Sequence, residues 1–412
     1  MPARTWNRRD FARLALALGA GATLPRTARA AAPDLRFERI ISRETLDAYL
    51  SRAITIQDLF IGQGNFDDNL RMLTSLGAKF LGRSLCFWGD EARLLAKLEK
   101  ARGLIARAHA ADPEMIAQAC VFEIVTRQVE SVPVPAWAFE AIGLPVESRN
   151  FRFADMASPD GKFRDHWGEG TTVPDVSRPE TQLWFHFLAA SYIDIGVEAI
   201  HYGQVELMAR NDRDLAHYAK VFERARAHAE AHARRKMLLC DGHVPSGGLV
   251  RDGGLLLDFH SFPLRVKEVP EKGPMEGVLE VGHVDSFYGR SRGGTTPSGW
   301  SCDHLPYLAE LDNWGPCDNP GQPNQPGGYW CWGYDEIGWF AHLPADRRRA
   351  WLAYADAWIK DHDPAGHLQM PGGRVLHTPV DGKHWYHAND PGPAVPDGFG
   401  DESAIRAIWA KG

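Results

Sequence analysis

Two strand-like runs in this 412-residue chain end in acidic residues at a spacing suited to acid and base chemistry. An apolar run that begins at Leu305 ends in Glu310 and Asp312, and a distant run ends in Gln204 and Glu206. Residues two apart on a strand point to the same face, so we expect the members of each pair to project together. Strand-end acids that only bind loop backbone are the alternative. The recurrence of the pattern predicts a general acid and base at one edge of a sheet.

The chain alternates between apolar, strand-like runs and stretches with helical spacing. The predicted strands are residues 53–58, 78–88, 115–123, 197–206, 236–243, 254–260, 307–312 and 328–334. The predicted helices are residues 66–76, 91–111, 180–195, 214–235 and 344–360. Eight strands, several of them separated by helices, predict an α/β fold of the (β/α)8 TIM-barrel type. A doubly wound sheet fits less well, because Gly62-Gln-Gly64 lacks the third glycine of a dinucleotide-binding turn.

The first 30 residues have the layout of an export signal. Arg8 and Arg9 precede an apolar run from Leu14 to Leu24, and Ala28-Arg-Ala30 offers small residues for cleavage. Paired arginines are typical of twin-arginine signals, so we expect a periplasmic or secreted protein. The alternative is a short N-terminal helix of a cytosolic protein. The run is too short and too rich in alanine and glycine for a stable membrane span.

Residues 31–412 are interpreted as a single barrel domain. Two segments break its rhythm: an insertion at residues 132–179, and an irregular loop at residues 264–302 that is rich in glycine and serine. The full chain carries a net charge of −7, and residues 1–30 contain six arginines and one aspartate, so their removal leaves −12. An acidic surface without a basic stretch disfavours nucleic acid and acidic lipid as partners.

Several further residues could bind metal but form no recognisable motif. The six cysteines include no Cys-x-x-Cys. Three lie in apolar runs and are expected to be buried thiols: Cys86, Cys120 and Cys240. Two lie in loop sequence and could pair: Cys302 and Cys317. Three histidines lie on the predicted helix 214–235, where we expect a solvated face: His217, His228 and His232.

Catalytic groups of (β/α)8 barrels come from the C-terminal ends of the strands. The polar residues at the predicted ends are Asp58, Arg83, Glu123, Gln204, Glu206, Asp241, His243, Asp258, His260, Glu310 and Asp312. Aromatic residues crowd the same edge: Trp88, Trp167, Tyr288, Trp314, Trp332, Tyr334 and Trp339. Acids, amides and histidines bind sugar hydroxyls, and the apolar face of a sugar stacks on indole. The combination predicts an oligo- or polysaccharide substrate, with core or loop packing as the alternative for the aromatics.

The positions of Glu206 on predicted strand four and Glu310 on predicted strand seven resemble those of the catalytic pair in clan A retaining glycoside hydrolases. The resemblance covers roughly residues 53–360. It implies that Glu206 is the acid/base and Glu310 the nucleophile, with no cofactor. Such chemistry requires the two carboxyl groups to lie about 5–5.5 Å apart. The substrate-binding residues would be Asp58, Arg83, Gln204, Asp241, His243, Asp258, His260, Tyr288, Asp312 and Trp332.

Two residues depart from the clan pattern. Val205 stands where the clan has asparagine, and Tyr288 is matched to the tyrosine that supports the nucleophile only by its place after predicted strand six. The segments around Glu206 and Asp312 also resemble those of exported bacterial barrel proteins, which implies no activity. If Asp312 were the reactive group and Glu310 its orienting partner, the separation from Glu206 would widen toward the inverting range of about 6.5–9.5 Å.

Three other functions remain open at this point. A metal-dependent hydrolase would use the pairs Asp241-x-His243 and Asp258-x-His260 on predicted strands five and six. The two histidines that amidohydrolase barrels carry on the first strand are absent, since Thr55-x-Gln57 stands there. A polysaccharide lyase would abstract a proton beside a uronate, using histidine, tyrosine or arginine near an acid. A non-catalytic carbohydrate-binding barrel would bind sugar without turnover.

Overall fold

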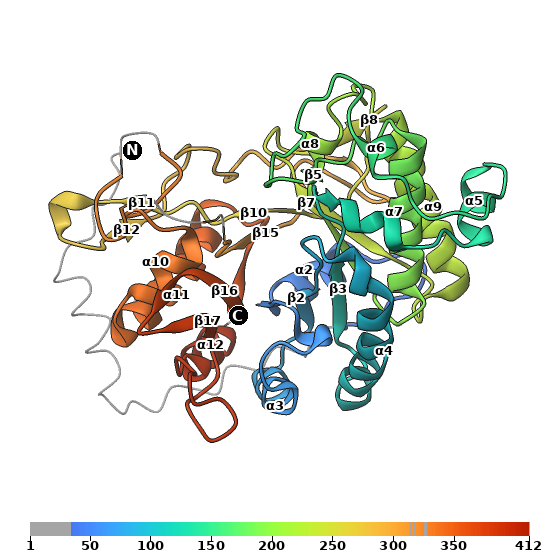
Figure 1. The fold of residues 1–412 in the computed structure, drawn as a ribbon. Coiled ribbons are helices and arrows are strands. Elements are labelled where there is room, and N and C mark those ends of the chain that lie inside the picture. Colours follow the sequence, from blue (N-terminus) through green and yellow to red (C-terminus); the bar gives the residue numbers. More distant parts are fainter. Residues whose placement is uncertain (1–33, 314, 316–318, 325–327, 412) are drawn as a thin grey trace. The chain divides into compact units, whose positions relative to one another are not determined.

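The computed structural model describes residues 34–313, 315, 319–324 and 328–411. The predicted export signal, Trp314 and Cys317 lie outside the described residues. Eight parallel strands form a closed barrel with helices on its outer side (Figure 1), which confirms the predicted (β/α)8 fold. Within the described part of the chain, no helix combines the length and the apolar character needed to cross a bilayer.

The barrel strands follow one another in chain order, and the last strand pairs in parallel with the first to close the ring. They are β1 (Ala53–Ile56), β2 (Phe80–Leu85), β3 (Ile116–Cys120), β6 (Ala199–Gln204), β7 (Leu239–His243), β10 (His260–Pro263), β15 (Tyr307–Glu310) and β16 (Gly366–Val380). Strand β17 (Lys383–His387) extends the sheet as an antiparallel partner of β16.

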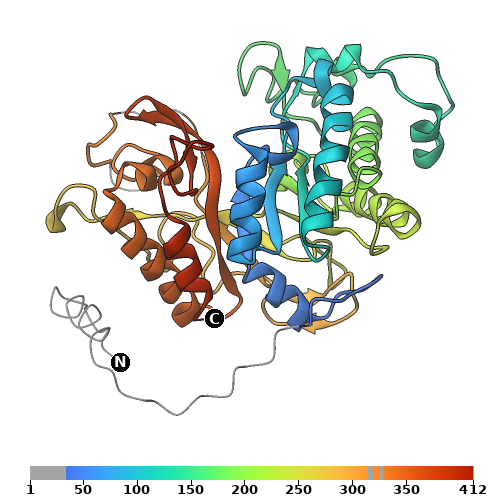
Figure 2. The ribbon, with the colours of Figure 1, turned by 90° about the horizontal axis from the view of Figure 1, so that it is seen from below.

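Helices connect most of these strands. The larger ones are α2 (Arg43–Leu50), α3 (Phe66–Leu76), α4 (Leu94–Ala111), α7 (Pro179–Ile193), α9 (Ala216–His232), α10 (Glu336–His342), α11 (Ala345–His362) and α12 (Glu402–Trp409). Figure 2 shows α3 and α4, in blue and teal, side by side outside the first strands, where Arg107 on α4 forms an ion pair with Asp67 on α3.

Residues 127–179, between β3 and α7, and residues 264–302, between β10 and β15, carry only short elements. The first segment holds α5 (Ala136–Ile142), α6 (Phe153–Met156) and β5 (Thr171–Thr172), which pairs with β4 (Val125–Thr126). The second holds the hairpin of β11 (Lys267–Glu268) and β12 (Gly277–Val278), followed by β13 (Gly294–Thr295) and β14 (Ser301–Cys302). The insertion predicted at residues 132–179 and the irregular loop predicted at residues 264–302 fall in these two segments.

Helix α3 spans the residues predicted for it, and local sequence explains where it begins and ends. The side chain of Asn65 caps α3 by accepting a hydrogen bond from the Asp68 N–H at 3.0 Å. Gly77 ends the helix with a left-handed backbone at φ +74°. Asparagine at the first cap and glycine after the last turn are the residues that these positions favour.

The predicted sixth strand is wrong in its position. Residues 254–255 form β9, which pairs in an antiparallel hairpin with β8 (Val250–Arg251), and barrel strand β10 begins only at His260. The cause is the turn at Asp252 and Gly253, which have φ values of +51° and +79°. Two consecutive positive φ values make a tight hairpin turn, and Asp-Gly is a preferred sequence for it.

The predicted eighth strand is also wrong. Residues 328–334 contain a turn in which Trp332 has φ +54°, and the eighth strand is β16, after α11. The Pro371-Gly-Gly sequence inside β16 looks like a strand breaker. The structure explains it: a Cβ on Gly372 would lie 2.8 Å from the side chain of Ile54 and from the Thr55 carbonyl oxygen. Glycine lets β16 approach β1 and close the barrel.

The barrel interior consists of an apolar layer with a polar layer above it. The apolar layer contains Ala53, Phe80, Ile116, Ala199, Leu239, Phe259 and Leu308. Two residues further along the strands come the buried polar side chains Thr55, Gln118, His201, Asp241, Ser261, Glu310 and Gln369. Branched apolar residues fill most such interiors. Burying polar groups has a free-energy cost unless they are hydrogen-bonded, so a polar layer at the C-terminal ends of the strands indicates a functional site.

The cysteine predictions need one correction. Cys86 and Cys120, which follow β2 and end β3, form a disulfide with their Cα atoms 4.9 Å apart. The prediction that both are free thiols is therefore wrong. Cys240 is a buried free thiol as predicted. Cys302 is half-buried, and its proposed partner Cys317 lies outside the described residues, so that pairing stays a prediction. Two adjacent parallel strands bring the first pair together, which sequence spacing alone could not indicate.

Candidate functional site

Glu310 lies at the centre of the polar layer, at the end of β15, with 2% of its surface exposed. The Arg83 Nε donates to its two oxygens at 2.9 and 3.1 Å, and the Arg83 Nη2 also pairs with Oε1. The Arg374 Nη1 lies 3.8 Å from Oε2. Burial opposes ionisation, but the two guanidinium groups outweigh it and hold the pKa of Glu310 well below its usual value. Glu310 is therefore an ionised carboxylate in a fixed position.

Asp312 and His243 lie beside Glu310 and are slightly more accessible. Arg374 pairs with Asp312 as well as with Glu310, so the two acids do project together as predicted. The His243 Nε2 lies 3.4 Å from Glu310 Oε1 and 3.1 Å from Arg83 Nη2. The side chains of Asp312 and His243 are 11% and 12% exposed. Burial alone would raise the pKa of Asp312. The positive charges of Arg374 and Arg83 lower that pKa by more than burial raises it, so the net shift is downward.

A second hydrogen-bonded group, centred on Asp241, lies in the same layer. The His201 Nδ1 is 2.7 Å from Asp241 Oδ2, and the Gln118 Nε2 donates to Asp241 Oδ1 at 2.7 Å. Burial raises the pKa of Asp241 to about 7 and holds that of His201 well below its usual value. The imidazole is neutral, and its Nε2 is buried without a partner among the described residues.

Register explains why these residues meet. Glu310 on β15 lies opposite Gln369 on β16. Gln369 donates to the Thr55 Oγ1 of the neighbouring strand β1 at 2.7 Å. It passes over Gly82 of β2, where a Cβ would lie 2.0 Å from the Gln369 Nε2. A glycine on the inward face of β2 therefore makes room for the polar layer.

Glu206 lies at the same end of the barrel but not on a strand. The chain turns at Val205 into the short helix α8 (Val205–Met208). The prediction that Gln204 and Glu206 share one face of a strand is therefore wrong. The Gln204 N–H and Nε2 donate to the two oxygens of Glu123 at 2.9 and 3.0 Å. Glu206 is partly exposed, and its Oε1 accepts the Ser246 N–H, in the loop after β7, at 3.0 Å. Within the described residues Glu206 and Glu310 share no hydrogen bond or ion pair.

An aromatic group adjoins the site where β2 and β3 end. The Arg83 guanidinium carbon lies 5.7 Å from the centroid of Phe122. Trp88 packs edge-to-face on Phe122 at 5.3 Å and on Trp167 at 5.2 Å. Half of the Trp88 surface is exposed, which leaves a large apolar face open to solvent beside the polar layer. Such a face can stack on a sugar ring.

Asp58 also lies at this end, directly after β1 and with a left-handed backbone at φ +59°. Its Oδ1 accepts the N–H of Cys86 at 3.2 Å, which links it to the loop that carries Trp88. Burial raises the pKa of Asp58 to about 6. The structure thus brings Asp58, Arg83, Asp241, His243, Glu310 and Asp312 to the predicted end of the barrel.

Two predicted site residues lie elsewhere because strand six begins later than predicted. Asp258 precedes β10, and its Oδ2 accepts the N–H of Cys240 at 2.8 Å and pairs with Arg226 of α9 at 2.9 Å. His260 is the first residue of β10, and its Nδ1 lies 3.1 Å from the Ser291 Oγ. The two Asp-x-His pairs therefore do not converge on one metal position, and the metal-dependent hydrolase loses its proposed ligand set.

Two predicted aromatic contacts are core residues instead. Tyr288 is 2% exposed and packs between Phe262 of β10 and Trp358 of α11, so it does not support Glu310. Trp332 is 4% exposed, and its Nε1 donates to the Glu276 carbonyl oxygen at 2.8 Å, which fixes the indole against the β11–β12 hairpin.

Sequence reasoning missed several members of the polar layer: Thr55, Gln118, His201, Ser261, Gln369 and Arg374. Four of them could have been found from period-two alternation, because they follow an inward apolar residue by two positions on strands one, three, four and six. Gln369 and Arg374 could not, because their strand contains Pro371-Gly-Gly and was assigned to another segment.

Comparison with known proteins adds no assignment. No protein-family model matches the chain, and no significantly similar curated protein was found. The function must therefore be argued from the geometry of the site.

Proposed function

We propose that this protein is an exported retaining glycoside hydrolase that cleaves an oligo- or polysaccharide, with Glu310 as nucleophile and Glu206 as acid/base. The observation that carries the proposal is the environment of Glu310. Inside a (β/α)8 barrel, at the C-terminal end of the seventh strand, two arginines keep this carboxylate ionised and oriented. Catalytic groups of such barrels come from this end, and a nucleophilic carboxylate must be charged.

In the first step, a Glu310 oxygen attacks the anomeric carbon of the sugar. The bond from that carbon to the leaving oxygen breaks, and the carboxyl group of Glu206 gives its proton to the leaving oxygen. Arg83 and His243, both on Glu310 Oε1, orient the attacking group. The partial exposure of Glu206 at the rim lets it reach a leaving group that departs toward solvent.

In the second step, water replaces the leaving group. Glu206, now a carboxylate, takes a proton from this water, whose oxygen attacks the anomeric carbon and releases Glu310. The sugar product keeps the configuration of the substrate because two displacements have occurred. Asp58, Asp241 and Asp312 would hold sugar hydroxyls, and Trp88 would stack on a ring outside the cleavage position.

Measuring the substrate and the product anomer tests this proposal. The purified protein is screened against aryl glycosides and polysaccharides, and the anomer released first is identified by proton NMR. Retention of configuration is the expected result. Inversion would instead favour Asp312 as a base with Glu310 as its orienting partner. Sugar affinity with no turnover of any bound substrate would contradict hydrolysis and favour a non-catalytic barrel.

A polysaccharide lyase is the second candidate, and the group around Asp241 favours it. His201 is bonded to Asp241 through Nδ1 and has an unpartnered Nε2 among the described residues, which suits a base that takes a proton beside a uronate carboxylate. Arg83 and Arg374 are the nearby cations that could bind that carboxylate. A product that absorbs as an unsaturated uronate would identify elimination, whereas hydrolysis gives none.

A further inference from the structure

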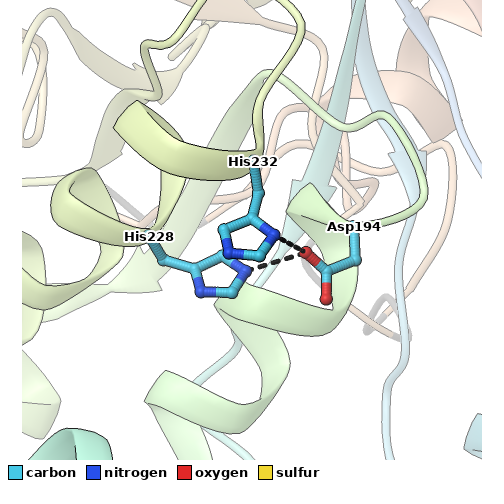
Figure 3. A group of neighbouring side chains, drawn as sticks. All are labelled: Asp194, His228 and His232. Atoms are coloured by element: carbon cyan, nitrogen blue, oxygen red, sulfur yellow. Dashed lines mark hydrogen bonds and ion pairs between the residues drawn. The ribbon is translucent and has the colours of Figure 1, made fainter.

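Three side chains converge on the outer side of the barrel, away from the polar layer. His228 and His232 lie four residues apart on α9, and Asp194 follows the last residue of α7 (Figure 3). The His228 Nε2 is 2.8 Å and the His232 Nδ1 is 3.5 Å from the same oxygen, Asp194 Oδ1. The expectation that these histidines belong to a merely solvated face is therefore incomplete.

The spacing of these residues suits metal coordination. Residues four apart on a helix lie on one face, one turn above the other. The two imidazole rings are stacked with centroids 4.1 Å apart and planes at 4°, so one ring has to rotate about its side-chain bonds for both in-plane nitrogen lone pairs to point at one ion. One donor atom from each of the three residues lies within 4.8 Å of the other two. Two neutral imidazole nitrogens and one carboxylate oxygen form a ligand set that Zn²⁺ and similar divalent transition metals accept.

A hydrogen bond alone explains only part of this arrangement. The contact of 2.8 Å between His228 and Asp194 is a normal hydrogen bond, but 3.5 Å from His232 to the same oxygen is long for one. A cation placed among the three donors would use both rings. The Asp194 carboxylate gives the group a negative charge that attracts a cation.

A surface depression of about 440 Å³ borders the three residues. His186 of α7 lines it and is only 5% exposed, and its ring centroid lies 6.2 Å from that of His228. Among the described residues, the buried Nδ1 of His186 has no hydrogen-bond partner. An unpartnered buried nitrogen on a residue that lines the same depression is an independent sign of a ligand position.

We propose that Asp194, His228 and His232 bind one divalent transition metal ion of the Zn²⁺ class. The open coordination position faces the depression that His186 lines. Asp194 directly follows α7, and the two histidines lie on α9. The bound ion would therefore link these two helices of the outer layer. A ligand that binds only the folded state stabilises it, so saturation with metal should raise the melting temperature.

Calorimetric titration tests the site. Untagged protein freed of metal with a chelator is titrated with ZnCl₂, and Co²⁺ absorption reports the ligand geometry. We expect one Zn²⁺ per chain. His232→Ala, His228→Ala and Asp194→Asn should each weaken binding by more than the roughly 10–100-fold that the loss of an outer-shell partner costs. His217→Ala is the matched control, because His217 lies on α9 and bonds Gln182 instead.

The comparison of variants decides the outcome. Binding that is lost in His232→Ala but retained in His217→Ala and Glu310→Gln supports the site. No Zn²⁺ binding by the wild type, or binding that His232→Ala and Asp194→Asn leave unchanged, overturns it. Binding that Glu310→Gln removes would move the ion to His243, Glu310 and Asp312, whose donors are also close together, and would overturn it too.

Discussion

The ends of β6 and β15 carry the two proposed catalytic carboxylates in opposite surroundings. At β15, Glu310 is buried and held by Arg83 and Arg374. Beyond β6, Glu206 lies on a short helix, partly exposed, and accepts a backbone N–H from Ser246. Two acids in contrasting environments at one edge of a barrel can take different roles in one reaction. The buried one is set as the charged group, whereas the accessible one can exchange protons with substrate and water.

The largest expected effect is the loss of activity when either acid is replaced. Glu310→Gln and Glu206→Gln should each lower kcat by roughly 10³-fold or more, since each removes a group that acts in the transition state. Initial rates on the best aryl glycoside measure the effect, with circular dichroism to confirm folding. Glu140→Gln on α5, an exposed glutamate on an outer helix, is the control and should keep full activity. Full activity in either site variant would end the assignment of that residue.

Added azide sharpens the contrast between the two positions. Glu310→Ala should regain turnover and give a glycosyl azide of inverted configuration, because azide replaces the nucleophile in a single displacement. Glu206→Ala should give one of retained configuration, because the glycosyl–Glu310 intermediate still forms. The product anomer is read by NMR, and the same configuration from both variants would contradict the division of roles.

The second effect concerns stability. Glu310→Gln removes the carboxylate that pairs with the buried Arg83 guanidinium. Breaking a buried ion pair in this way lowers the free energy of unfolding by about 3–5 kcal/mol. Glu206→Gln changes a partly exposed side chain and should stay within about 0.5 kcal/mol. Urea unfolding measures both. Equal destabilisation of the two variants would show that the environments differ less than the contacts indicate.

The same contrast predicts a pH dependence. The pKa of Glu310 in the folded state lies well below its usual value of 4.5, because the two arginines outweigh burial. Below 4.5 the unfolded chain binds a proton at this residue that the folded chain does not, so stability falls as pH falls toward the folded pKa. The difference in free energy of unfolding between wild type and Glu310→Gln should be largest above pH 5 and should shrink as the pH falls toward 3. A difference independent of pH would argue against a charged Glu310.

A smaller effect separates two tryptophans. Trp88→Ala should raise KM about tenfold with little change in kcat or stability, because half of the ring surface is exposed and free to stack on sugar. Trp332→Ala should leave KM unchanged but destabilise the fold by about 3–5 kcal/mol, because that ring is buried. Steady-state kinetics and urea unfolding distinguish them. The reverse pattern would return Trp332 to the substrate site.

Much of the barrel could be predicted because its first strands and helices have clear periodicity. Helix α3 and strands β1, β2 and β3 lie within their predicted ranges, and so does Glu310 at the end of β15. The errors come from local features that only tertiary contacts explain. A tight turn at Asp252-Gly253 displaced the sixth strand, and close packing on Ile54 required the glycines inside β16.

The candidate site was predictable to the extent that its strands were. Arg83, Asp241, His243, Glu310 and Asp312 lie where the strand ends predicted them. Asp258 and His260 were misplaced together with their strand, and Arg374 was missed because its strand was not recognised. The arginines around Glu310 come from β2 and β16, and their convergence depends on barrel closure, which no local pattern encodes.

Trapping the covalent intermediate tests the central claim most directly. The protein is incubated with 2-deoxy-2-fluoro glycosides that carry a good leaving group and match the sugar it cleaves, and the labelled peptide is sequenced by mass spectrometry. A glycosyl group on Glu310 is the predicted result, and Glu206→Gln should still accept it from such a substrate. A label on Asp312 or on Glu206 would contradict the account.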